Sequence, residues 1–194
     1  MLTTHPLPIT TPFYFIRHGE TEWNRRGTSM GQTDIPLNER GIQQAYAAQA
    51  FLKNLEVGAV YSSSLKRAHQ TAQIINEALS RPLYTTDHLR ERGWGEGEGK
   101  PFDENFFVNL PDHLLPEGAE KYPDFEARIL SALKSATAMA DQPTLIVAHG
   151  GVFMVLTRLM GYPNLHAENC VPYLFRPPAT KDQLWFVCEL GQTP

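Results

Sequence analysis

The alternation of strands and helices constrains the fold of this 194-residue chain more than any other feature of its sequence. Short apolar, β-prone segments are separated by segments with helical spacing, which is typical of α/β domains with a mostly parallel sheet. The expected strands cover residues 13–16, 59–61, 144–148, 172–175 and 184–190, and the expected helices cover residues 38–55, 63–79, 122–140 and 149–161. We therefore predict a three-layer αβα fold, with helices on both faces of the sheet.

One domain and a short lead-in account for the chain. Residues 1–12 carry no Lys or Arg and no apolar block, so we predict a flexible N-terminal lead-in and not a secretory signal. Residues 13–194 are then a single domain, large enough to bury a core without a metal or a disulfide. Residues 87–120 follow no helical or strand period and hold nine acidic and three basic residues, a net charge of −6. Long irregular segments in compact domains are usually functional, and we predict an insert near 90–120 over the site.

The composition excludes several classes of partner. Net charge is −4 and the pI is about 6.0, so the protein as a whole does not attract nucleic acid or an anionic membrane. The longest purely apolar run is five residues, 152–156, against the ~20 that span a bilayer. The only two cysteines, Cys170 and Cys188, have no metal or redox spacing and suit a reducing cytoplasm. We predict a cytoplasmic protein without a nucleic-acid or membrane partner, and a homo-oligomer stays possible.

Chemically capable side chains follow three of the expected strands. The first strand runs into Arg17-His18-Gly19, the second into serines that lead to Arg67, and the strand at 144–148 into His149-Gly150. The carboxyl ends of parallel strands meet at one edge of such a sheet, which is where its sites lie. Arginine forks and the N–H groups at a helix start bind phosphate oxygens, and a histidine can act as a nucleophile or carry a proton. The combination indicates a phosphoryl site, although each residue alone is more often structural.

Five blocks of sequence, in order, resemble one known family. They are 15–24 (FIRHGETEWN), 33–41 (TDIPLNERG), 61–72 (YSSSLKRAHQTA), 89–99 (LRERGWGEGEG) and 147–151 (VAHGG). The first is similar to the RHG signature of the histidine phosphatase superfamily, branch 1, the phosphoglycerate mutase-like group. Residues 13–194 are thereby identified as one domain of this family. The chain departs from the pattern at Gly97, where many relatives have Trp, and only partly matches it at 117–120.

The resemblance implies a role for each matched residue. His18 would attack phosphorus and become a phosphohistidine, and Glu91 would protonate the leaving oxygen and then activate water. The implied catalytic group is Arg17, His18, Arg67, Glu91 and His149. The implied phosphate-binding group is Arg17, Asn24, Arg67, His149 and Gly150. Two arginines neutralise the phosphoryl oxygens in this scheme, so no metal and no cofactor are expected.

Three functions are compatible with this site, and they differ in the fate of the phosphoryl group. The first is hydrolysis of a small phosphomonoester, and the second is a cofactor-dependent phosphoglycerate mutase-type isomerase. The third is a phospho-ligand binding module without catalysis, which the complete set of expected catalytic residues disfavours. A mutase must shield its phosphohistidine from water, and mutases of this family carry a longer segment between the acid and the second histidine. The short interval here favours the phosphatase.

The irregular segment also bears on the substrate. It combines apolar side chains with its acidic excess, and these are either a small core under a loop or part of the pocket wall. They are Trp94, Phe102, Phe106, Phe107, Val108 and Leu110. In the second case we expect a monophosphate with an apolar or neutral body to be preferred over substrates that carry several negative charges.

Overall fold

The structure, a computed structural model, describes residues 9–101, 112–138, 141–163, 165–180 and 183–191. The strands are β1 (Phe13–Arg17), β2 (Val60–Ser63), β3 (Leu83–Thr86), β4 (Thr144–Ala148), β5 (Pro172–Arg176) and β6 (Phe186–Glu189). The α-helices are α1 (Glu22–Arg25), α2 (Glu39–Leu52), α3 (Lys66–Leu79), α5 (Tyr122–Ala138) and α6 (Gly150–Leu159). Short 3₁₀ turns cover η1 (Asp87–Leu89), η2 (Gly95–Gly97) and η3 (Asp112–Leu114).

The strands form one sheet in the order β3-β2-β4-β1-β5-β6. The first four strands in this order are parallel, and β5 and β6 run antiparallel to their neighbours. The register pairs Arg17 with Ala148 and Ser62 with Val147, so β1, β2 and β4 reach the same edge of the sheet. His18, Arg67 and His149, which follow these strands, are thereby brought together.

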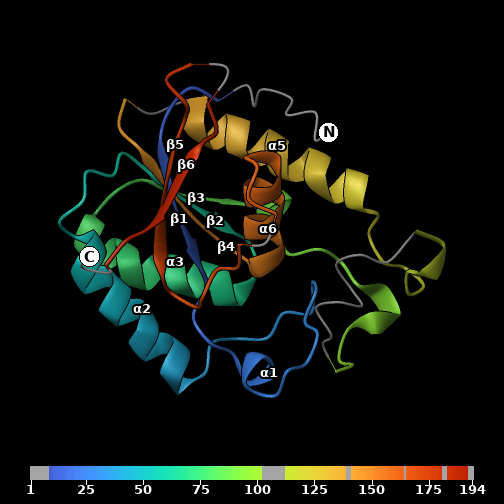
Figure 1. The fold of residues 1–194 in the computed structure, drawn as a ribbon. Coiled ribbons are helices and arrows are strands. Elements are labelled where there is room, and N and C mark those ends of the chain that lie inside the picture. The colour runs from blue at the N-terminus through green and yellow to red at the C-terminus, as the bar shows by residue number, and fades with distance from the viewer. Residues whose placement is uncertain (1–8, 102–111, 139–140, 164, 181–182, 192–194) are drawn as a thin grey trace.

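Two apolar clusters, one on each face of the sheet, make the three layers. Helices α5 and α6 pack on one face, where Phe13 and Phe15 of β1 are fully buried. Helices α2 and α3 pack on the other, against Ile16 of the same strand. This alternation along β1 is the two-residue period of a strand that is covered on both sides. Figure 1 shows the sheet between the two pairs of helices, and the predicted αβα fold is confirmed.

Several element boundaries differ from the prediction. Asn38 caps α2 as expected, since its side-chain oxygen accepts from the Gly41 N–H, but the helix ends at Leu52. Neither Ser63 nor Ser64 caps α3; the N-cap is Leu65, because Ser63 belongs to β2 and its hydroxyl accepts from the Leu65 N–H. The sequence analysis missed β3 and the four-residue helix α1, which are too short to show a period.

The lead-in and the insert are partly described. Residues 1–8 lie outside the described residues, whereas Ile9 is 5% exposed and packs into the cluster with α5 and α6. The packed part of the chain therefore begins before residue 13. In the insert, residues 90–101 and 112–120 contain only short 3₁₀ turns, with bridges from Trp94 to Ala119 and from Pro101 to Thr28. The second bridge holds this segment beside the chain that follows β1.

Candidate active site

His18 lies directly after β1, and its geometry fixes which ring nitrogen is reactive. The side chain is 2% exposed, and Nδ1 lies 2.7 Å from the Gly19 carbonyl oxygen. Because a carbonyl only accepts, Nδ1 carries the hydrogen and Nε2 keeps its lone pair. Burial, and then the positive charges of Arg67 and Arg17, lower the pKa of His18 well below 6.5. The ring is therefore neutral near pH 7, which is the form that a nucleophile needs.

The backbone that carries His18 is fastened to α2 and α3. The Gly19 N–H donates to the Thr71 hydroxyl at 3.1 Å. A Cβ atom on Gly19 would collide with the Gly41 carbonyl, and one on Gly41 would collide with the Glu20 carbonyl. Two backbones can approach this closely only where both residues lack side chains. The loop after β1 is thus locked against the start of α2.

Two arginines, Arg17 and Arg67, line the same cavity as His18. Arg17 Nη1 donates to the Ala167 carbonyl at 2.9 Å. Arg67 has no exposed surface, and it donates from Nη1 to the Thr33 carbonyl at 2.9 Å and from Nη2 to the Gly31 carbonyl at 2.8 Å. Its Nε is buried without a partner among the described residues. Burial lowers the pKa of Arg67 to about 10, so it is charged at neutral pH.

His149 lies behind His18 at the end of β4. The two ring centroids are 5.1 Å apart, and His149 is fully buried. Its Nε2 lies 2.8 Å from the Ser63 hydroxyl, while Nδ1 is buried and has no partner in the described part of the chain. Burial, and then the charge of Arg67, lower the pKa of His149 well below 6.5. His149 is also the N-cap of α6, and this places the N–H groups of the first turn toward the same region.

Glu91 spans the gap between the insert and α6. Its Oε1 accepts from the Arg92 N–H at 2.8 Å, and its Oε2 accepts from the Gly151 N–H at 2.9 Å. The carboxyl group thus lies beside the start of α6. A Cβ atom on Gly151 would collide with Glu91, so this approach requires the glycine.

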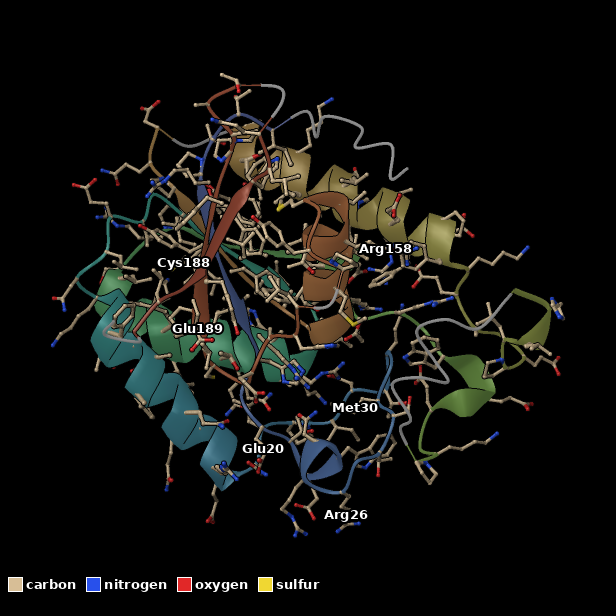
Figure 2. All side chains as sticks on the ribbon, in the orientation of Figure 1. Glu20, Arg26, Met30, Arg158, Cys188 and Glu189 are labelled. Atoms are coloured by element: carbon tan, nitrogen blue, oxygen red, sulfur yellow. The ribbon has the colours of Figure 1, made fainter. Side chains whose placement is uncertain are left out.

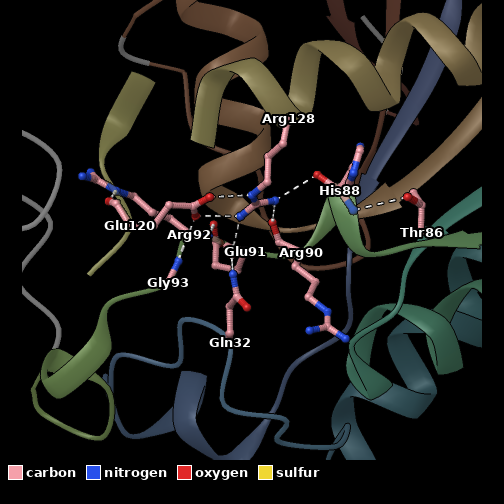
Figure 3. A network of polar contacts seen from close by, with 9 residues as sticks. All are labelled: Gln32, Thr86, His88, Arg90, Glu91, Arg92, Gly93, Glu120 and Arg128. Atoms are coloured by element: carbon pink, nitrogen blue, oxygen red, sulfur yellow. Dashed lines mark hydrogen bonds and ion pairs between the residues drawn. The ribbon is translucent and has the colours of Figure 1, made fainter. Parts of the chain in front are cut away.

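A network centred on Arg128 of α5 holds the chain around Glu91 (Figure 3). Arg128 donates to the carbonyls of His88, Arg90 and Glu91 at 2.9, 2.6 and 2.8 Å. It also pairs with the Glu120 carboxylate at 2.6 Å. Residues 117–120 match the family pattern only partly, and the structure shows that Glu120 of this stretch contacts Arg128.

The site borders a cavity of about 260 Å³. Of the predicted site residues, six line it: Arg17, His18, Asn24, Arg67, Glu91 and Gly150. His149 is not among the lining residues and reaches the cavity only through its contact with His18. The Asn24 side-chain oxygen accepts from the N–H and the hydroxyl of Thr21, which is the N-cap of α1, so Asn24 completes the capping box of this helix.

The outer part of the cavity is mostly apolar and aromatic. Its lining includes Trp23, Met30, Trp94, Tyr122, Phe125 and Met154. Figure 2 shows Met30, a lining residue, near α1; Arg158, also labelled there, belongs to α6 and is not among the lining residues. Of the aromatic insert, only Trp94 can be placed, since Phe102, Phe106, Phe107, Val108 and Leu110 lie outside the described residues.

The sequence analysis missed Arg92 as a pocket residue. It is 4% exposed, lines the cavity, and lies 4.5 Å over the Trp94 ring. Its position directly after Glu91 was the available signal, but it was counted only toward the charge of the segment. The cavity therefore holds a third positive group, which weakens the expectation that substrates with further negative charge are repelled.

The described residues contain neither a cluster of metal-binding side chains nor a membrane-spanning helix. No three His, Cys, Asp or Glu side chains in the described ranges gather as a metal site. Within those same ranges, no helix is long and apolar enough to cross a membrane.

The fold and the site together define an α/β protein whose cavity, lined by Arg17, His18 and Arg67, lies at the carboxyl ends of its parallel strands. The chain belongs to the histidine phosphatase superfamily, branch 1, whose family model matches residues 13–172. The resemblance found in the sequence is thereby confirmed.

Relatives in the family carry both phosphatase and mutase names. The chain is 37% identical over 164 residues to "Uncharacterized phosphatase PhoE" of Bacillus subtilis, and the aligned residues cover 83% of this chain and 84% of that protein. It is 35% identical over 168 residues to "Probable phosphoglycerate mutase GpmB" of Yersinia pestis, and this alignment covers 80% of this chain and 77% of that protein. The solved structure "Bacillus stearothermophilus YhfR" matches with a TM-score of 0.77 and 28% identity, covering 95% of this chain and 98% of that one.

Proposed function

We propose that the protein hydrolyses a small phosphomonoester through a phosphohistidine on His18. The observation that carries the proposal is the state of this side chain: buried, neutral, with Nδ1 donating to the Gly19 carbonyl and Nε2 left as the nucleophile. Charged Arg17 and Arg67 and Gly150 at the start of α6 border the same cavity. Phosphoryl transfer needs mainly in-line positioning and neutralised oxygens, and these groups supply both.

The proposed reaction has two balanced steps. In the first, the Nε2 lone pair of His18 forms the N–P bond while the P–O bond to the alcohol breaks, and Glu91 gives its proton to the leaving oxygen. In the second, Glu91 takes a proton from water, the water oxygen bonds to phosphorus, and the N–P bond breaks to free the histidine. Glu91 lines the same cavity as His18, which suits a group that meets the leaving oxygen.

Isomerisation is the second candidate, because one relative is named as a phosphoglycerate mutase. The relative named as a phosphatase and the short interval between Glu91 and His149 support hydrolysis instead. A panel of phosphomonoesters, assayed for both free phosphate and phosphoryl migration, separates the two. We expect release of phosphate and an acid-labile phosphohistidine that can be trapped. Interconversion of 2- and 3-phosphoglycerate faster than loss of phosphate would favour the mutase.

We propose that the body of the substrate is apolar or neutral, and that it packs against the aromatic lining of the outer cavity. A comparison of kcat/KM for an aromatic monophosphate with that for 3-phosphoglycerate and a sugar bisphosphate tests this. A preference for either multiply charged substrate would overturn it and would point to Arg92 as the group that binds the extra charge. We also propose a cytoplasmic setting, in which the free thiols Cys170 and Cys188 would persist.

A further inference from the structure

The loop Gly31–Thr33 lies between two opposite charges. On one side, the Arg67 guanidinium donates to the Gly31 and Thr33 carbonyls at 2.8 and 2.9 Å. On the other side, the Glu98 carboxylate accepts from the Gln32 and Thr33 N–H groups at 2.9 and 2.8 Å. The loop is thus held from both sides by charge-assisted hydrogen bonds.

One peptide group joins the two charges directly. The Gly31 carbonyl and the Gln32 N–H belong to the same peptide bond, with the carbonyl bonded to Arg67 and the N–H bonded to Glu98. The peptide dipole therefore points its negative end at the cation and its positive end at the anion. Hydrogen bonds in such a chain polarise and strengthen one another in a low-dielectric interior.

Glu98 makes more contacts than a solvated surface carboxylate would. Besides the two loop N–H groups, it accepts from the Thr33 hydroxyl at 2.5 Å and from the Trp94 N–H at 3.1 Å. Gly31 has a φ of +49°, and a Cβ atom there would collide with the Glu98 carboxylate. The loop is therefore shaped to admit this side chain, whereas Glu96, two residues earlier, is exposed.

Arg67 needs such support because it is fully buried. A buried cation is costly unless hydrogen bonds and a nearby negative charge compensate it. Glu98 is one of the carboxylates whose charge favours the protonated form of Arg67 and partly offsets the effect of burial on its pKa. The carbonyls of the loop fix the guanidinium, and Glu98 fixes the loop.

We infer that Glu98 is a positioning residue, which holds Arg67 in its phosphate-binding orientation through the peptide groups of Gly31–Thr33. Glu98 is not among the residues that line the cavity, so its proposed effect is indirect. The inference rests on the proposed phosphate site, and it deepens that proposal by assigning a function to a carboxylate outside the pocket.

A double-mutant cycle tests this inference through phosphate binding. The variants are Glu98→Gln, Arg67→Ala and the double variant, with Glu96→Gln as the matched control from the same turn. Affinity for inorganic phosphate is measured by calorimetry, and kcat/KM is measured with an aryl phosphate. Glu98→Gln is expected to weaken phosphate binding about tenfold in the wild-type background but less than about twofold in the Arg67→Ala background, since coupled residues are non-additive. Glu96→Gln is expected to change neither.

Equal losses in both backgrounds, or wild-type affinity in Glu98→Gln, would overturn the inference. If Glu98→Gln does not fold, Thr33→Val replaces it; this variant removes one of the bonds to Glu98 and is expected to weaken phosphate binding about threefold, again only when Arg67 is present. The thermal unfolding temperature of each variant shows whether weaker phosphate binding comes from a destabilised fold or from a displaced Arg67 side chain. Because calorimetry needs no turnover, a protein that binds phosphate without hydrolysing esters would contradict the proposed function alone.

Discussion

The two ends of the site are built by different means. At the phosphate end, His18, Arg67 and His149 follow strands or begin a helix, and each is 0–2% exposed. At the acid end, Glu91 lies in a segment with only short 3₁₀ turns, placed by hydrogen bonds from side chains such as Arg128 and Gln32. The sheet ladder and the core thus place the backbone of the first end, where hydrogen bonds to the loop Gly31–Thr33 fix the Arg67 guanidinium, and a polar network places the backbone of the second end. Changes at the two ends should therefore have separable effects.

The largest effect is expected at the phosphate end. His18→Ala removes the nucleophile and should lower kcat/KM by at least about 10⁴-fold on every phosphomonoester, aryl or alkyl. Steady-state kinetics and loss of the trapped phosphohistidine measure this. His113→Ala, at an exposed histidine, serves as the control. Full activity in His18→Ala would rule out the proposed mechanism.

Glu91→Gln should act selectively, because it removes a proton donor and leaves the phosphate end intact. We expect a loss of about 10²–10³-fold for alkyl phosphates and less than about tenfold for aryl phosphates, whose leaving groups need little protonation. Rates for a series of leaving groups give the comparison, with exposed Glu117→Gln as control. An equal loss on both classes would mean that Glu91 positions substrate and does not donate a proton.

Arg128→Met breaks the network at the acid end without touching the strands. Because it frees the carbonyls of His88, Arg90 and Glu91, kcat/KM for alkyl phosphates should fall about tenfold, while the inhibition constant for phosphate should change less than about twofold. A matching loss of phosphate affinity would show that the two ends are not independent.

The buried histidines make stability depend on pH. Folding lowers the pKa of both His18 and His149, so below about pH 6.5 the unfolded chain binds more protons than the folded one. The free energy of unfolding should therefore decrease as the pH is lowered through this range, by up to about 1.4 kcal/mol per pH unit for each histidine. Chemical denaturation between pH 5 and 7.5 measures the slope. His18→Asn should make it shallower, and the same change at exposed His88 should not.

The smallest effect is expected from a chelator. Since Arg17 and Arg67 supply the positive charge at the phosphoryl oxygens, EDTA should change the rate by less than about twofold. A large loss that added magnesium restores would show that a metal takes part.

The sequence predicted the phosphate end better than the acid end, for a physical reason. Strand periodicity and parallel-sheet topology together bring His18, Arg67 and His149 to one edge, so local patterns sufficed. Arg92 and Glu98 could not be placed in this way, because each has a partner in a chain segment distant in sequence: the Glu120 carbonyl for Arg92 and the Gln32 N–H for Glu98. The start of α3 was also missed: Leu65 occupies the N-cap position without a side-chain hydrogen bond, serines dominate that stretch, and only the register shows that Ser63 is in the strand.

The contact between Gly19 and Gly41 has an evolutionary consequence. Neither position can accept a side chain without moving the backbone that carries His18, so variants at either are expected to be purged from any population that needs the reaction. Residues 92–101 and 112–120 carry no such mutual lock on the nucleophile. Outside Glu98 and Glu120, which support Arg67 and the chain around Glu91, a lineage can therefore diversify this stretch and acquire new substrates while the backbone around His18 is inherited unchanged.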